Sequence, residues 1–334
     1  MAKPVVLLTD PIAREGIAVL ERAGCDIRVA EDRSQPGLRA ACAGADAVIV
    51  RSWLPEDAFD GAERMLVAVR HGAGVDMIPV PPATRNGVLA SRVPGANAAA
   101  VAEFAIGQML GACRGVEKLD AALRAEGWDK ARARTSQATE LAGKTLGLVG
   151  VGDIGRHLAR IAHHGFGMRV LGFRRSVANL PEGVTYAPLD RLFAEADYIV
   201  VACPLTDETR GLVDAALLAR MKPTAWIMNV ARGPIIDEAA LVAALRERRI
   251  GGAALDVYAT QPLAPDHPLL SLPNVIATPH GAGISRESGV ALAVRSAEEV
   301  VRVLSGERPV ALVNPDALPA HNARRAALGL GAIA

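Results

Sequence analysis

A glycine pattern near the middle of the chain has the spacing of a phosphate-binding turn. The apolar residues 146–149 lead into Gly150, Gly152 and Gly155, which form a G-x-G-x-x-G motif. The first glycine permits a tight turn, the second lets backbone approach a phosphate, and the third lets helix and strand pack closely. A helix after the turn would offer free N–H groups to the anion. The motif predicts a dinucleotide site, with a plain strand–helix turn as the alternative.

Polar side chains with catalytic potential follow later apolar segments. They are Arg232 after residues 226–229, Asp256 and Gln261 at the end of residues 252–257, and His280 after residues 275–278. The carboxyl ends of parallel strands meet at the edge where open α/β sheets bind ligands. A guanidinium group suits a carboxylate, and imidazole transfers protons near neutral pH. We therefore expect these side chains at one edge of a sheet.

Composition excludes several classes of protein. The 334 residues are enough for about two domains, and 51% are hydrophobic. Lys plus Arg number 37 and Asp plus Glu 36, so nothing favours binding to nucleic acid or to an anionic membrane. No apolar run approaches the roughly 18 residues of a membrane span. Residues 1–10 resemble a first strand rather than a signal peptide.

The cysteines are scattered along the chain and lie mostly among apolar residues. They are Cys25, Cys42, Cys113 and Cys203. Their spacing fits neither a disulfide framework nor a zinc site. We interpret them as buried, reduced thiols of a cytoplasmic protein without a metal.

Strands and helices alternate along most of the sequence. Expected strands are 5–9, 27–30, 47–51, 65–71, 88–90, 146–149, 169–173, 198–202, 226–229, 252–257 and 275–278. Expected helices are 11–23, 156–163, 285–304 and an Ala-rich stretch over 97–125 with a break near Gly111. Residues 309–314 could return to the first domain, and the tail after Pro315 shows no clear period.

This pattern predicts an α/β fold with two Rossmann-like domains, each a doubly wound parallel sheet. The expected NAD(P)-binding domain covers residues 98–283. It would be inserted in a discontinuous substrate domain, formed by residues 1–97 and 284–334.

The end of the second strand of the dinucleotide unit indicates which cofactor is preferred. NAD-binding units carry an acidic residue there for the ribose hydroxyls. Here the strand ends in Arg174, Arg175 and Ser176, with no acid. Arginines would pair with an adenosine 2′-phosphate. We predict that NADP(H) is preferred and that NAD(H) is possible; the alternative is that the arginines are solvated surface charges.

In order and spacing, these motifs resemble the D-isomer-specific 2-hydroxyacid dehydrogenase family. The match runs from the loop over residues 72–76 to His280. The resemblance implies an oxidoreductase that reduces a small 2-oxo acid, such as glyoxylate or hydroxypyruvate, to the D-2-hydroxy acid, or the reverse. It also implies a homodimer with the active site between the two domains.

The resemblance also implies roles for individual residues. Arg232 would bind the substrate carboxylate and carbonyl, His280 would donate or accept the proton, and Gln261 would orient the histidine. Substrate-binding residues would be Arg51, Ala73, Gly74, Asn97, Arg232 and His280. Cofactor-binding residues would be Gly150, Gly152, Asp153, Ile154, Gly155, Arg174, Arg175, Ser176, Pro204, Thr209, Val230, Ala231, Arg232, Asp256, His280, Ala282 and Gly283.

Gln261 departs from the family pattern, which has Glu at this position. A carboxylate beside His280 would help the ring to hold a proton, whereas an amide contributes no charge. We therefore expect a more acidic optimum for reduction. Gln261 and the following Asp266-His267-Pro268 also resemble formate dehydrogenases of the family, which is one alternative function. A non-catalytic NAD(P)-sensing protein is another.

Overall fold

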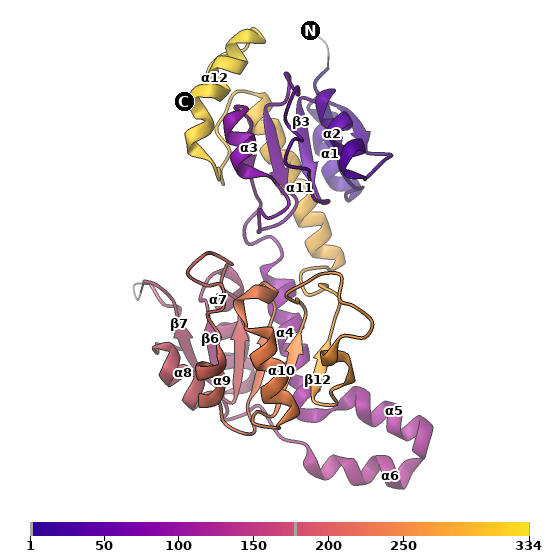
Figure 1. Cartoon of the computed structure of the whole chain (residues 1–334), viewed down its shortest axis with the longest axis vertical. Helices are drawn as coiled ribbons and strands as arrows, with labels where there is room; N and C mark the ends of the chain where they lie inside the picture. The colour runs from indigo at the N-terminus through magenta and orange to yellow at the C-terminus, as the bar shows by residue number, and fades with distance from the viewer. Residues whose placement is uncertain (1–2, 177–178, 334) are drawn as a thin grey trace. The chain divides into compact units, whose positions relative to one another are not determined.

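The computed structural model describes residues 3–176 and 179–333. The chain forms two compact units. Unit 1 combines Met1–Asn97 with Ile284–Ala334, and unit 2 is Ala98–Gly283. Figure 1 shows that each unit has a sheet with helices on both of its faces. The predicted α/β, Rossmann-like fold class is thereby confirmed.

Unit 1 is built on a parallel sheet with the strand order β2-β1-β3-β4-β5. Its strands are β1 (Val5–Leu8), β2 (Asp26–Val29), β3 (Ala47–Val50), β4 (Val67–Arg70) and β5 (Leu89–Ser91). Its helices are α1 (Arg14–Arg22), α2 (Gln35–Ala43), α3 (Val80–Arg85), α11 (Arg286–Leu304) and α12 (Leu318–Ala327). Strands β1 and β3 are apolar at every position because helices cover both faces. Helices α2 and α3 pack on one face, whereas α1 and α11 pack on the other.

The last part of the chain joins the sheet of unit 1 through polar contacts. The Val313 N–H donates to Ala90 O at 2.8 Å, and the Asn314 side chain accepts from Ala90 N and donates to Val88 O. The expected return of residues 309–314 to the first domain is therefore confirmed. The tail after Pro315, for which the sequence showed no clear period, forms α12 over residues 318–327. This helix is fixed by tertiary contacts, including His321 Nδ1 with Gly87 O at 3.0 Å, rather than by an apolar period.

Unit 2 has a parallel sheet with the strand order β12-β11-β10-β9-β6-β7-β8. Its strands are β6 (Thr145–Val149), β7 (Arg169–Phe173), β8 (Val184–Tyr186), β9 (Tyr198–Val201), β10 (Trp226–Asn229), β11 (Gly252–Leu255) and β12 (Val275–Ala277). Its helices are α4 (Ala98–Arg114), α5 (Val116–Glu126), α6 (Trp128–Ala133), α7 (Asp153–Arg160), α8 (Leu189–Glu195), α9 (Ala215–Arg220) and α10 (Glu238–Arg246). Helices α8, α9 and α10 cover one face, and α4 and α7 cover the other.

Three details of unit 2 and of the cysteines differ from expectation. The Ala-rich stretch breaks at Gly115, not at Gly111. Gly115 adopts the left-handed conformation, with φ 58°, and this conformation interrupts the helix between α4 and α5. Figure 1 shows α5 and α6 projecting from the body of this unit. Helix α7 starts three residues earlier than predicted, at Asp153.

All four cysteines are free thiols, but Cys25 and Cys203 are only half-buried. Among the described residues, no helix is long and apolar enough to cross a bilayer.

The burial of His321 predicts a pH-dependent loss of stability. Burial and the nearby guanidinium groups of Arg324 and Arg325 lower the pKa of His321 from 6.5 to about 4. As the pH falls below 6.5, the unfolded chain binds a proton at His321, whereas the folded chain binds it only near pH 4. The free energy of unfolding therefore decreases as the pH is lowered from 6.5 to about 4. For one histidine the loss approaches about 3 kcal/mol.

Chemical denaturation of the wild type and of His321→Gln across pH 4–7 measures this effect. Part of the loss is expected to remain in the variant, because the pKa of His71 is also lowered to about 4 by burial and by Arg51 and Arg70. Equal pH dependence of the two proteins would contradict the assignment to His321.

Candidate active site

The glycine-rich turn after β6 has the close approaches that its spacing predicts. Gly150 has φ 104°, and its N–H donates to Phe173 O at 2.9 Å. A Cβ on Gly150 would lie 2.6 Å from Cys203 N, and a Cβ on Gly155 would lie 2.5 Å from Gly150 O. Side chains at these two positions are thus excluded by neighbouring backbone. Packing requires glycine at both positions, and the positive φ of Gly150 favours glycine there as well.

Gly152 differs from the other two glycines because open space surrounds it. A Cβ built on it meets nothing within 4 Å, and the residue is exposed at the N-cap of α7. No side chain caps this helix, and Asp153 and Ile154 form its first turn. An uncapped helix N-terminus beside exposed glycine backbone fits a pyrophosphate. When bound, a nicotinamide dinucleotide would be held here and would supply hydride transfer.

The residues after β7 lie beside this turn. Arg174 is half-buried and its guanidinium group donates to Asn179 O at 3.5 Å, whereas Arg175 and Ser176 are exposed. On the other side of β6 comes the loop after β9. There the Thr209 hydroxyl accepts from Thr206 N and donates to Pro204 O, both at 2.7 Å. The Thr209 side chain therefore shapes this loop.

Arg232 stands at the carboxyl end of β10, and a buried asparagine shapes its loop. The Asn229 side chain donates to Arg232 O at 2.9 Å and accepts from Ala231 N at 3.0 Å. The Arg232 guanidinium group donates to Ala231 O at 2.7 Å. Val230 and Ala231 are buried beneath the loop. The role of Asn229 was missed at the sequence level, although a polar residue ending an apolar strand could have indicated it.

Asp256 organises the loop that carries His280. Its side chain is 1% exposed and accepts from the Thr278 hydroxyl at 2.7 Å, Gly281 N at 2.9 Å and Ala282 N at 2.8 Å. The backbone N–H of His280 donates to Asp256 O at 2.8 Å. These contacts hold His280 in the left-handed region, with φ 54°, which is uncommon for a residue with a side chain. Asp256 was predicted to bind the cofactor, and the structure shows it as a support for the histidine loop.

Gln261 and His280 meet directly. Gln261 Oε1 lies 2.9 Å from His280 Nδ1. Because an amide oxygen only accepts a hydrogen bond, this contact assigns the hydrogen to Nδ1. The loop of Gln261 is anchored by Glu238, which accepts from Ala259 N at 3.0 Å and contacts His267 Nε2 at 3.2 Å. Glu238 was also missed, because only the fold brings it to this loop.

The expected substrate residues Arg51, Ala73, Gly74 and Asn97 lie in unit 1. Arg51 directly follows β3, and its guanidinium group donates to Pro11 O. Ala73 and Gly74 lie in the loop after β4, where Ala73 O accepts from Arg92 at 3.1 Å. Asn97 is half-buried immediately before α4. Arg51, Ala73 and Gly74 thus follow neighbouring strands of the unit 1 sheet.

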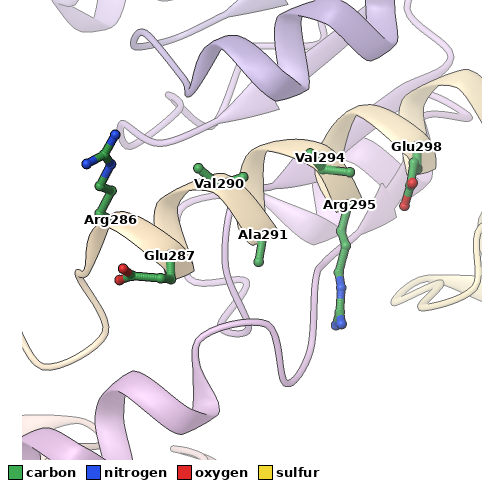
Figure 2. Close-up of a pocket in the computed structure, with 7 residues that line it drawn as sticks. All are labelled: Arg286, Glu287, Val290, Ala291, Val294, Arg295 and Glu298. Carbon is green, nitrogen blue, oxygen red and sulfur yellow. The ribbon is translucent and has the colours of Figure 1, made fainter.

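Two hollows on the described part of the surface are lined by other residues. One hollow runs along α11, and Figure 2 shows the residues that line it, Arg286, Glu287, Val290, Ala291, Val294, Arg295 and Glu298. A second groove near His163 lies at the amino ends of β7 and β8, opposite to the edge that carries Arg232 and His280. Within residues 3–176 and 179–333, no cluster of His, Cys, Asp and Glu could hold a metal ion.

The fold and the glycine-rich turn define a dinucleotide-binding protein with a histidine–amide pair at the sheet edge. The family model for the "D-isomer specific 2-hydroxyacid dehydrogenase, NAD binding domain" matches residues 106–282. The chain is 37% identical to D-3-phosphoglycerate dehydrogenase of Methanocaldococcus jannaschii over 320 residues, covering 94% of this chain and 60% of that protein. It is 35% identical to glyoxylate reductase of Thermofilum pendens over 329 residues, covering 95% and 96%.

A solved structure shows the same similarity. It is the NADPH-dependent glyoxylate/hydroxypyruvate reductase of Sinorhizobium meliloti in complex with NADP and malonate. The TM-score is 0.81 at 28% identity, covering 95% of this chain and 98% of that one. The chain therefore belongs to the D-isomer specific 2-hydroxyacid dehydrogenase family, a family of NAD(P)-dependent oxidoreductases. The family predicted from the sequence is confirmed.

Gly233 offers a test of how tightly the catalytic loops are packed. A Cβ on this residue would lie 1.9 Å from the carbonyl carbon of Tyr258, in the loop after β11. We expect Gly233→Ala to lower the free energy of unfolding by at least about 2 kcal/mol, because backbone must move. Gly281→Ala is the matched control, since its Cβ would meet nothing within 4 Å. Urea denaturation compares them, and equal stability would disprove the close packing.

Proposed function

We infer that this protein reduces a small 2-oxo acid to its D-2-hydroxy acid, or catalyses the reverse reaction. The observation that carries this proposal is the contact between Gln261 Oε1 and His280 Nδ1 at the carboxyl edge of the unit 2 sheet. Arg232 follows β10 at that same edge, next to β11, from which Asp256 supports the histidine loop. A proton-transfer group and a fixed cation on neighbouring strands suit a substrate with a carbonyl and a carboxylate.

Each side chain would have one task in the reaction. Arg232 would pair with the substrate carboxylate and polarise the carbonyl, as a fixed positive fork does. His280 would give a proton from Nε2 to the developing alkoxide in reduction and remove it in oxidation. Gln261 would keep Nδ1–H engaged, so that Nε2 faces the reaction with its lone pair or its proton. In unit 1, the backbone of Ala73 and Gly74 and the side chain of Asn97 would help to bind the substrate.

NADP(H) is the proposed cofactor, with NAD(H) as a weaker alternative. Support comes from the strand end after β7, where Arg174 and Arg175 stand without an acid. Two guanidinium groups favour an adenosine 2′-phosphate over a bare ribose hydroxyl.

The charges at one edge of the unit 1 sheet would suit a second anionic group on the substrate. Arg51 follows β3 and Arg70 ends the neighbouring strand β4, and both lower the pKa of the buried His71. Positive charge is thus concentrated at this edge of the unit 1 sheet. Such an edge favours an acid with a further carboxylate, phosphate or sulfonate, although hydroxypyruvate and glyoxylate stay within the proposal.

Gln261 favours a second candidate, formate oxidation, because that reaction needs no proton from the histidine. The Asp266-His267-Pro268 segment adds no weight to it, since His267 contacts Glu238 and so has a structural role.

A homodimer in the cytosol is also proposed. Exposed Val116, Leu123 and Trp128 on α5 and α6 supply apolar surface for a dimer, and free thiols suit a reducing compartment.

Turnover assays test the proposed reaction. We expect NADPH oxidation with glyoxylate, hydroxypyruvate or a related 2-oxo acid, and a higher kcat/KM with NADPH than with NADH. His280→Gln should lower kcat by about 100-fold or more, because the proton donor is lost. His164→Gln, on an exposed residue outside the site, is the control. NADPH binding without turnover would favour a sensor, turnover of formate the second candidate, and equal efficiency with NADH would refute the cofactor preference.

Replacing Gln261 by Glu should shift the pH profile of reduction upward. The carboxylate stabilises the protonated imidazolium, so the ring keeps its proton to higher pH and the descending limb moves by about one pH unit. Gln261→Met, which removes the hydrogen bond without adding charge, should lower kcat without this upward shift. Profiles of kcat/KM from pH 5 to 9 measure the effect. An unmoved limb in Gln261→Glu would show that the two side chains do not interact during catalysis.

A further inference from the structure

The backbone carbonyl groups of the loop after β4 are held by donors from a neighbouring loop. Strand β4 lies between β3 and β5 in the unit 1 sheet. Gly72 O accepts from Val93 N at 2.9 Å, and Ala73 O accepts from the guanidinium group of Arg92 at 3.1 Å. Both donors belong to the segment that directly follows β5. This segment therefore fixes one side of the loop.

Arg70 fixes the start of the same loop on the side of β3. Its Nη1 donates to Val50 O at 3.1 Å and to His71 O at 2.6 Å. The guanidinium group also covers the backbone of Gly72, because a Cβ built there would lie 3.4 Å from Arg70 Cζ. The Gly72 N–H donates to Arg70 O at 2.8 Å. Three successive carbonyl groups, those of residues 71–73, are thus engaged.

Two N–H groups of the loop are not engaged. In the described part of the chain, the N–H groups of Ala73 and Gly74 donate to no protein group, and both residues are half-buried. In a trans peptide, the N–H points opposite to the carbonyl of the preceding residue. The bond from Val93 to Gly72 O therefore aims the Ala73 N–H. The bond from Arg92 to Ala73 O aims the Gly74 N–H in the same way.

We propose that Arg92 is a positioning residue, which presents the Gly74 N–H to the carboxylate of the substrate by holding Ala73 O. This rests on the proposed function, in which the backbone of this loop helps to bind the substrate. A donor that is already oriented binds an anion without reorganisation of the loop. Within the described residues no other donor contacts Ala73 O. Without Arg92 this peptide can rotate, because glycine on its far side tolerates many backbone conformations.

Steady-state kinetics of Arg92→Met, with the 2-oxo acid that the wild type turns over fastest, test the proposal. KM should rise by about five- to tenfold, because a hydrogen bond to the carboxylate is weakened. The change in kcat should stay below about twofold, since the carboxylate is bound equally before and during the reaction. A purely structural defect would instead reduce the active fraction, and thus kcat, at an unchanged KM.

Two further variants serve as rescue and control. Arg92→Lys keeps a donor for Ala73 O and should recover most of the KM. Arg85→Met removes another exposed arginine, which precedes β5 and so lies at its opposite end from Arg92. It should leave KM and kcat unchanged. An equal rise of KM in Arg85→Met would overturn the proposal, because net charge alone would then explain the effect.

Salt separates positioning from attraction of an anion by the exposed Arg92 cation. Attraction between exposed charges is screened strongly at about 0.5 M salt, whereas a hydrogen bond to a neutral carbonyl is not. The ratio of KM between Arg92→Met and the wild type should therefore persist in KCl at about that concentration. A ratio that falls to one would overturn the proposal, since Arg92 would then act through its charge.

Hydrogen exchange provides a readout without turnover. Oxalate, added with NADPH, should slow exchange of the peptide that contains Ala73 and Gly74 in the wild type, and slow it less in Arg92→Met. Equal protection in the two proteins, with turnover intact, overturns this inference alone. Weaker protection in the variant of a protein that reduces no 2-oxo acid supports the inference while the proposed reaction fails. Neither protection nor turnover in the wild type overturns both.

Discussion

The candidate site depends above all on one buried carboxylate. Asp256 accepts hydrogen bonds from Thr278, Gly281 and Ala282, and these bonds offset the loss of hydration that burial imposes. A carboxylate in this position must find donors, and the backbone after β12 supplies two of them. The loop is therefore determined by the need to satisfy Asp256. The left-handed conformation of His280 follows from that constraint, since a residue with a side chain adopts it only where surrounding contacts require it.

Each strand-end loop of unit 2 has its own internal support. Asn229 shapes the segment that carries Arg232, and Glu238 anchors the segment that carries Gln261. Gly233 allows the loops after β10 and β11 to approach, with a Cβ position only 1.9 Å from Tyr258. The segments that carry Arg232 and Gln261 are thus positioned by residues that have no proposed role in the reaction. Such support favours catalysis because oriented groups need little reorganisation during the reaction.

The parts of this arrangement that sequence could predict are those encoded locally. Strands β7 and β10 were predicted with their observed bounds, because apolar runs end sharply at polar residues. The glycine turn was predicted from its spacing together with the apolar residues before it and the helical pattern after it. Helix α12 was not, because His321 and Arg325 are buried by contacts with Gly87 and Val303, far away in sequence. The contacts of Glu238 and Thr278 could not be predicted for the same reason, because their partners are distant in sequence and only the fold brings them together.

Gln261 orients the ring of His280 without placing a charge beside it. Its amide oxygen lies at 2.9 Å from His280 Nδ1, which is the distance of a full hydrogen bond. Orientation of the ring therefore needs an acceptor but no negative charge. What the amide cannot do is stabilise the imidazolium across the pH range in which reduction needs it. In the proposed reaction, Gln261 would keep the orientation of His280 for proton transfer but would not raise the proton affinity of the ring as a Glu would, so the proposed chemistry would run at a lower pH.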